Sequence, residues 1–201
     1  MLYHTFVVDQ KAGITFRHYE EDKMLTVGDK FPSFDLAAVD GLDSPTLTRS
    51  SSAEYKGRWL VAFFWPKDFT FVCPTEISTF GLMQPSFAEA GADLIGVSID
   101  SEYVHLAWRE QHPHLRRLPF PMVSDLKREL TTALGILDHS EGVALRATFI
   151  VDPEGTIRFV SVNDLNTGRN AEEVLRSLKV IQAGGLTSCG WQAGDPLLVP
   201  A

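Results

Sequence analysis

The hydrophobic pattern of this chain contains short, continuous apolar runs of the length of β-strands. Residues 59–65 are apolar at every position, and residues 94–99 form a second run that Gly96 and Ser98 interrupt. Strands covered on both faces have this pattern, because neither face requires polar side chains. We therefore predict two buried strands here, with the first at the centre of the sheet, and shorter strands at residues 32–36 and 121–123.

Amphipathic stretches between these runs predict the helices. In residues 171–182 the apolar positions recur at helical spacing, and Gly184 follows as a helix end. Asp100 and Ser101 form a cap for the next helical stretch, which stops before Pro113. Two further helices are predicted, at residues 71–87, which include Gly81 and Pro85, and at residues 126–134, closed by Gly135.

A turn signal near residue 153 separates two more strands. Residues 147–151 and 157–160 flank the sequence Asp152-Pro153-Glu154-Gly155, with proline at the second position of the turn and glycine at the fourth, which predicts a hairpin. Strands that alternate with helices, followed by a hairpin and a final helix, indicate an α/β fold with a mixed sheet flanked by helices. Residues 186–201 are expected to form an irregular tail.

The composition narrows the class of protein. The 201 residues are 44% hydrophobic and 22% charged, which fits one compact domain. A net charge of −8 with scattered Lys and Arg argues against a nucleic-acid partner. The longest apolar run is far shorter than the roughly 20 residues of a membrane span, and the N-terminus lacks the order of a secretory signal, so a cytoplasmic location is expected.

Two cysteines are too few for a disulfide scaffold in a chain of this length, so each is expected to be free, catalytic or metal-bound. Cys73 lies in the motif Pro66-x-x-x-Thr70-x-x-Cys73-Pro74-Thr75-Glu76, where the central strand leads into a helix. The unpaired N–H groups and the dipole of a helix start favour a thiolate over a thiol. The spacing from Cys73 to Glu76 is that of a capping box, and either Thr70 or Cys73 is the N-cap. A small buried core cysteine is the alternative that these residues leave open.

The sequence around Cys73 resembles a known family. Residues 63–76, FFWPKDFTFVCPTE, are similar to the active-site signature of typical two-cysteine peroxiredoxins of the alkyl hydroperoxide reductase C type. Further similarity occurs at residues 96–100, 119–125 and 146–152, and it extends from about Met24 to Pro196. The resemblance implies a thioredoxin-like fold and a homodimer that assembles into a ring of dimers. No cofactor is expected, because neither a G-x-G-x-x-G motif nor a P-loop occurs.

The same resemblance assigns roles to five residues. Cys73 would be the peroxidatic cysteine, and Cys189 the resolving cysteine that closes an intersubunit disulfide. Pro66 would shield the pocket, Thr70 would hydrogen-bond the sulfur or the peroxide, and Arg146 would hold the thiolate and polarise the peroxide oxygen. The structural alternatives are a helix cap for Thr70, a solvated strand-end charge for Arg146 and an incidental exposed thiol for Cys189.

Three further features of the sequence lie outside the motif around Cys73. Trp108 matches a position near the pocket in relatives, but its helical spacing favours core packing. Trp191 is expected to anchor the tail that carries Cys189. Residues 1–23 have no counterpart in the family and are interpreted as an extension or a misassigned start, which leaves residues 24–185 as the peroxidase domain and residues 186–201 as the tail.

The expected function is a thiol-dependent peroxidase that reduces hydrogen peroxide and organic hydroperoxides through a sulfenic acid. A sulfenic acid condenses with a second thiol or is oxidised further, so a resolving thiol is needed. The reductant stays open among thioredoxin, a flavoprotein reductase and a CxxC adaptor. The alternative function is a holdase or redox-sensing binding module on the same scaffold. A metal site at His105, His112 and His114 is disfavoured by Pro113 and by the lack of a nearby carboxylate cluster.

Overall fold

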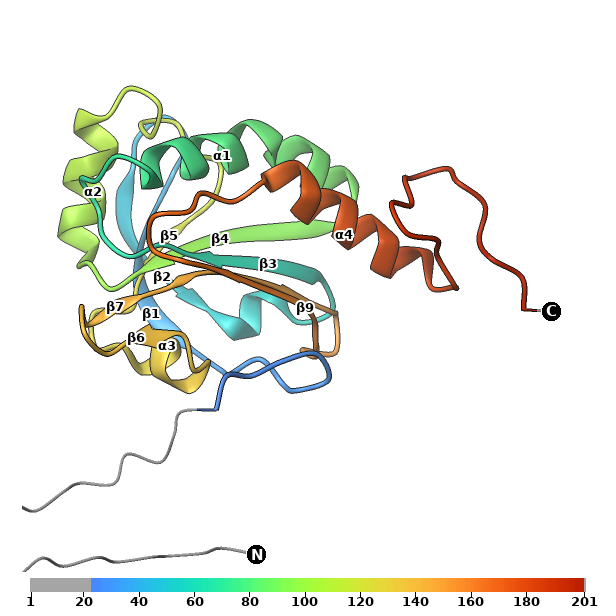
Figure 1. Ribbon diagram of the computed structural model, residues 1–201. Coiled ribbons are helices and arrows are strands. Elements are labelled where there is room, and N and C mark those ends of the chain that lie inside the picture. Colours follow the sequence, from blue (N-terminus) through green and yellow to red (C-terminus); the bar gives the residue numbers. More distant parts are fainter. Residues whose placement is uncertain (1–22, 201) are drawn as a thin grey trace, which may run out of the picture.

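The computed structural model describes residues 23–200, which form a seven-stranded mixed sheet with helices on both faces (Figure 1). The predicted extension, apart from Lys23, lies outside the described residues. The strand order is β2-β1-β5-β4-β3-β8-β9. The strands are β1 (Asp35–Asp40), β2 (Thr46–Ser51), β3 (Trp59–Phe64), β4 (Ala92–Ser98), β5 (Met122–Ser124), β8 (Arg146–Val151) and β9 (Ile157–Asn163), and β6 (Leu137–Asp138) pairs with β7 (Val143–Ala144) in a separate hairpin.

The centre of the sheet is parallel, and its flanks are antiparallel. β3 pairs with β4 and β4 with β5 in parallel, whereas β8 runs antiparallel to β3, and β9 antiparallel to β8. This arrangement confirms the predicted mixed sheet and hairpin. It also places the start of β8 beside the end of β3, because Thr148 pairs with Phe63.

Helices α1 (Cys73–Glu89) and α4 (Ala171–Ala183) pack together over one face of the sheet, with α2 (Glu102–Gln111) beside them (Figure 1). Helix α3 (Glu129–Ala133) lies on the opposite face, and the short 3-10 helix η1 (Ser52–Tyr55) follows β2. The Ser101 hydroxyl caps α2 as predicted, and the Asn170 side chain caps α4. No helix within residues 23–200 is long and apolar enough to cross a membrane.

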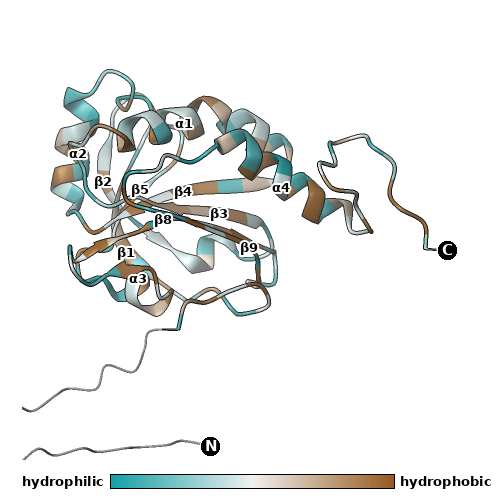
Figure 2. Ribbon diagram, in the orientation of Figure 1, coloured by the Kyte–Doolittle hydropathy of each residue, from teal (hydrophilic) through white to brown (hydrophobic). Residues whose placement is uncertain are grey.

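β3 is buried on both faces, as its apolar run predicts. Val61, Phe63 and Trp65 belong to the core beneath α1 and α4. Leu60, Ala62 and Phe64 belong to the core on the other face. Figure 2 shows brown segments along the central strands and more teal on the helices that cover them. The end of β3 is therefore held rigidly, and this is the point from which the loop to α1 begins.

Some predicted elements differ from the structure. The helix predicted at residues 126–134 starts only at Glu129, because Arg128 has φ 60°, outside the helical region, and the Asp125 carboxylate accepts the first free N–H groups of α3. β1 starts at Asp35, after the predicted Pro32. β2, β6 and β7 were not predicted, because β2 is a polar edge strand and the others have two residues each.

Candidate active site

Cys73 is the first residue of α1 and is fully buried. Val72 is the N-cap of α1, and its apolar side chain makes no capping hydrogen bond in the described part of the chain. Neither Thr70 nor Cys73 is therefore the cap, and the predicted capping box is wrong. Pro74 occupies a position where a missing N–H costs little. Cys73 thus lies in the first turn of α1, where the positive end of the helix dipole favours an anion.

Two polar groups converge on the sulfur of Cys73. The Thr70 hydroxyl lies 2.9 Å from Sγ, and Nη1 of Arg146 donates to Sγ at 3.3 Å. The Thr70 hydroxyl is also 3.0 Å from the carbonyl oxygen of Lys67. A hydroxyl has one proton, so Thr70 donates to Lys67 when it accepts from a thiol and donates to sulfur when the sulfur is a thiolate. The site can thus accommodate both protonation states.

Arg146 is held by a buried ion cluster. Its side chain is 4% exposed, so it is not a solvated strand-end charge. Nη1 donates to Glu76 Oε2 at 2.7 Å, and Nε donates to the carbonyl oxygen of Leu165 at 2.6 Å. These contacts direct one edge of the guanidinium group at Cys73.

Arg169 completes this cluster. Its Nε and backbone N–H both donate to Glu76 Oε1 at 2.8 Å, and its Nη2 donates to Oε2 at 3.0 Å. The guanidinium also lies over the ring of Phe63. Two cations therefore share one carboxylate beside the sulfur, which leaves an excess of positive charge. Sequence reasoning missed Arg169, because it lies in a polar loop whose composition is that of an exposed segment, and it assigned Glu76 only to a cap.

A surface cavity of about 420 Å³ lies beside this site, and the fully buried Cys73 is not among the residues that line it. Pro66, Thr70 and Arg146 line it, together with apolar side chains that include Val143 and Leu165. The structure therefore brings Pro66, Thr70, Cys73 and Arg146 together. A hydroperoxide in this cavity would meet Thr70 and Arg146 on the way to the sulfur.

Cys189 lies elsewhere, exposed on the tail that follows α4. Trp191 is 6% exposed, and its carbonyl oxygen accepts a hydrogen bond from Arg176 of α4, so the tail is anchored as expected. Figure 1 shows the tail beyond the end of α4, away from the first turn of α1. The structure thus does not bring Cys189 to Cys73 of the same chain.

The other residues singled out from the sequence, Trp108 and three histidines, lie outside the group of side chains that contact the Cys73 sulfur. Trp108 is 2% exposed in the core and packs against the ring of Phe69. The buried ring of His105 contacts Asp68, whereas the rings of His112 and His114 lie near each other. Within residues 23–200 no group of three metal-binding side chains converges.

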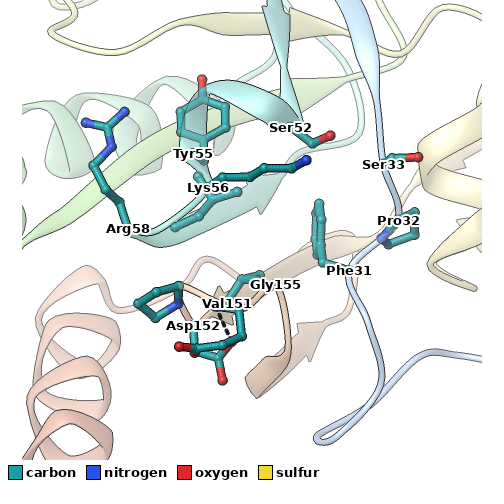
Figure 3. Close-up of a pocket in the computed structure, with 13 residues that line it drawn as sticks. Phe31, Pro32, Ser33, Ser52, Tyr55, Lys56, Arg58, Val151, Asp152 and Gly155 are labelled. Carbon is teal, nitrogen blue, oxygen red and sulfur yellow. Dashed lines mark hydrogen bonds between the residues drawn. The ribbon is translucent and has the colours of Figure 1, made fainter.

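A second cavity, of about 350 Å³, lies at the opposite end of β3 (Figure 3). Phe31, Tyr55 and Val151 are among the residues that line it. Burial raises the pKa of Tyr55 to about 12, and its hydroxyl is paired with Ser50. The Tyr55 phenol therefore stays protonated at neutral pH, and neither cysteine lines this cavity.

Comparisons with known proteins agree with this geometry. Residues 27–160 match the AhpC/TSA family. Alkyl hydroperoxide reductase C of Mycolicibacterium smegmatis is 52% identical over 184 residues, which cover 87% of this chain and 94% of that protein. Among solved structures, Mycobacterium tuberculosis AhpC has a TM-score of 0.78 at 48% identity, covering 85% of this chain and 100% of that chain. The reduced 2-Cys peroxiredoxin of Plasmodium vivax has a TM-score of 0.80 at 30% identity, covering 85% and 91%.

Proposed function

The chain belongs to the AhpC/TSA family and is a thiol-dependent peroxidase with a thioredoxin-like fold, and we propose that Cys73 is its nucleophile and Cys189 its resolving thiol. The convergence of Thr70 and Arg146 on the buried sulfur at a helix start is the observation that carries this proposal. The alternative of a holdase or binding module is not favoured, because the similar proteins are named as reductases and peroxiredoxins.

The first step is attack of the Cys73 thiolate on a hydroperoxide. The sulfur bonds to the terminal oxygen, the O–O bond breaks, and the other oxygen leaves as an alkoxide or hydroxide that takes up a proton. Cys73 becomes a sulfenic acid, and the peroxide is reduced to an alcohol or water. Arg146 and Thr70 would stabilise the charge that moves from sulfur onto the leaving oxygen.

The second step is condensation of the sulfenic acid with Cys189, which forms a disulfide and releases water. A disulfide requires Cα atoms within about 4.4–6.8 Å. Helix α1 has 17 residues and is about 25 Å long at about 1.5 Å per residue, and Cys73 is at the end away from the tail. We therefore assign the partner thiol to Cys189 of the partner subunit. The first turn of α1 must open for this bond to form.

Two features of the structure support a mode of assembly. In the described chain β2 and β9 are the edge strands of the sheet, and edge strands pair readily with a second copy. β2 is polar, whereas β9 contains Phe159, Val160 and Val162. A groove of about 1150 Å³ beside α1 and α2 contains Phe71, which is 94% exposed, and Leu82, which is 83% exposed. We propose that β9 forms the homodimer and that the groove joins dimers into a ring.

Turnover requires a dithiol reductant to restore both thiols by disulfide exchange. Thioredoxin, a flavoprotein reductase and a CxxC adaptor all supply that chemistry. A cycle that ends in reduction of a disulfide fits the reducing conditions of the cytoplasm, which is the proposed location.

The Cys189→Ser variant tests the intersubunit disulfide. Peroxide is expected to convert wild-type monomer bands into dimer bands on a non-reducing gel, and Cys189→Ser is expected to prevent this. The variant should still consume about one peroxide per Cys73 and then stall, since attack precedes resolution. Dimer bands that persist in the variant, or a wild type that is cross-linked only within one monomer, would contradict the assignment.

We also propose that the folded peroxidase domain spans residues 24–185. The amide of Leu25 donates to the carbonyl oxygen of Leu134, and Met24 packs so closely on Gly135 that an added Cβ would lie 2.5 Å from Met24 Cα. Deletion of residues 1–23 is expected to leave the melting temperature and peroxide activity unchanged. Deletion of residues 1–30 is the matched comparison and should lower the melting temperature, because it removes the bond of Gly28 to the start of β9 and the bonds of Lys30 to the turn between β8 and β9. Unfolding of the shorter deletion would show that the extension is structural.

A further inference from the structure

The loop between β3 and α1 contains a buried polar cluster that the proposed reaction does not use. Asp68 in this loop and His105 on α2 have side chains that are 1% and 0% exposed, and Asp68 Oδ2 lies 2.6 Å from His105 Nδ1. Nε1 of Trp65 donates to the other Asp68 oxygen at 2.7 Å. Burial raises the pKa of Asp68, which shows that the surroundings disfavour its charge. Buried pairs of this kind contribute little net stability, so their presence suggests another role.

The cluster joins the loop to three core elements. The backbone N–H of Asp68 donates to the Asp100 carboxylate at 2.8 Å, and the Ser98 hydroxyl donates to the same oxygen. Nε2 of His105 lies 3.3 Å from the carbonyl oxygen of Val123 on β5. A carbonyl oxygen only accepts, so Nε2 carries a proton. The contact with Asp68 is then a hydrogen bond with one proton between Nδ1 and Oδ2, which is donated either by a protonated His105 or by a protonated Asp68.

The character of the loop changes immediately after Asp68. Phe69 has φ 55°, a left-handed conformation that is unfavourable for a residue other than glycine, and it is 52% exposed. The Thr70 hydroxyl contacts only the loop and first turn in the described chain, namely Lys67 and the Cys73 sulfur, and Phe71 is 94% exposed. Phe69, whose ring packs on Trp108 of α2, therefore lies between a segment bonded to β4, α2 and β5 and residues 70–72, which make no hydrogen bond to those elements in the described chain.

We propose that Trp65, Asp68 and His105 form an anchor that fixes the first half of the loop, and that Phe69 is the hinge at which the first turn of α1 opens for disulfide formation. This inference rests on the proposed roles of Cys73 and Cys189. Asp68 and His105 are positioning residues, because they act on Thr70 through the backbone and do not touch the sulfur.

The anchor affects the two chemical steps in opposite ways. Attack on peroxide needs Thr70 and Arg146 in contact with the Cys73 sulfur, which is the ordered state of the loop. Disulfide formation needs the open state. Loss of the anchor shifts the population from ordered to open, so attack becomes slower and resolution faster.

Stopped-flow measurement of both steps with hydrogen peroxide tests this split. In Asp68→Ala, the attack rate is expected to fall about tenfold and the rate of disulfide formation to rise several-fold. Asp68→Asn can still accept from Trp65 and donate to His105, so it should restore most of both rates. Tyr55→Phe loses a hydrogen bond at the far end of β3 and should change neither rate. A fall in both the attack rate and the rate of disulfide formation, or no change in either rate, would contradict the anchor proposal.

Hydrogen exchange of the wild type gives a test that does not depend on a variant folding. On conversion to the disulfide, the amides of Thr75 and Glu76, which donate to the carbonyl oxygen of Val72, are expected to lose protection. The amides of Trp65 and Asp68, bonded to Val97 and Asp100, should keep theirs. If the wild type reacts with peroxide but Trp65 and Asp68 lose protection, the anchor proposal is wrong and the proposed function still stands. A wild type that does not react with peroxide would instead contradict the proposed function.

Discussion

Replacement of Cys73 by serine is expected to lower peroxide turnover by roughly 10³-fold or more with every reductant, because a serine hydroxyl is essentially unionised at neutral pH. The position is fully buried, and serine is close in size to cysteine, so the fold should be retained. The measurement is peroxide consumption coupled to a dithiol reductant, with circular dichroism to confirm folding.

Cys189→Ser is the matched control for this experiment. It also removes a thiol, but it should still consume about one equivalent of peroxide, whereas Cys73→Ser should consume none. Residual turnover above a few per cent in folded Cys73→Ser would show that the nucleophile is a different group.

Arg146→Ala is expected to slow the oxidation of Cys73 by roughly 10²-fold, equivalent to about 2.7 kcal/mol of transition-state stabilisation. The guanidinium group lies 3.3 Å from the sulfur and would meet the charge that develops on the leaving oxygen. The second-order rate constant with hydrogen peroxide, measured in a single turnover without reductant, isolates this step.

The variant should remain folded, because Glu76 keeps its bonds to Arg169 when Arg146 is removed. Arg158→Ala is a suitable control, since Arg158 is a partly exposed arginine on β9 whose partner is Asp152. Its rate constant should equal that of the wild type. An unchanged rate constant in Arg146→Ala would show that Arg146 has only a structural role.

The local features of the site could be predicted from the sequence. The continuous apolar run of β3 indicates burial on both faces, and the motif that follows indicates a helix start at Cys73. Thr70 is three residues from Cys73, so their contact requires only the local turn. The predicted cap was wrong because a capping box describes hydrogen bonds within one helix, whereas Glu76 is bonded to arginines that come from elsewhere in the chain.

Contacts between distant residues were not visible in any local pattern. Arg146 is 73 residues from Cys73, and Arg169 is 93 residues from Glu76. Arg146 was identified from the family resemblance, and Arg169 was not identified at all. Arg146 meets Cys73 because β8 pairs antiparallel with β3 and returns its first residue to the end of the sheet where α1 begins. β9 ends beside Arg146 and leads into the loop that contains Arg169.

Hydrophobic period and turn chemistry act over a few neighbouring residues, so they are enough to predict the α/β class, the central strand and the helix start that favours a thiolate. Only the packing of the elements shows which side chains surround the sulfur, that Asp68 is bonded to His105, and that Cys189 lies away from Cys73 of its own chain. An apolar pattern specifies which face of an element is buried, but it leaves open which partner covers that face. Strand order and helix packing supply that partner.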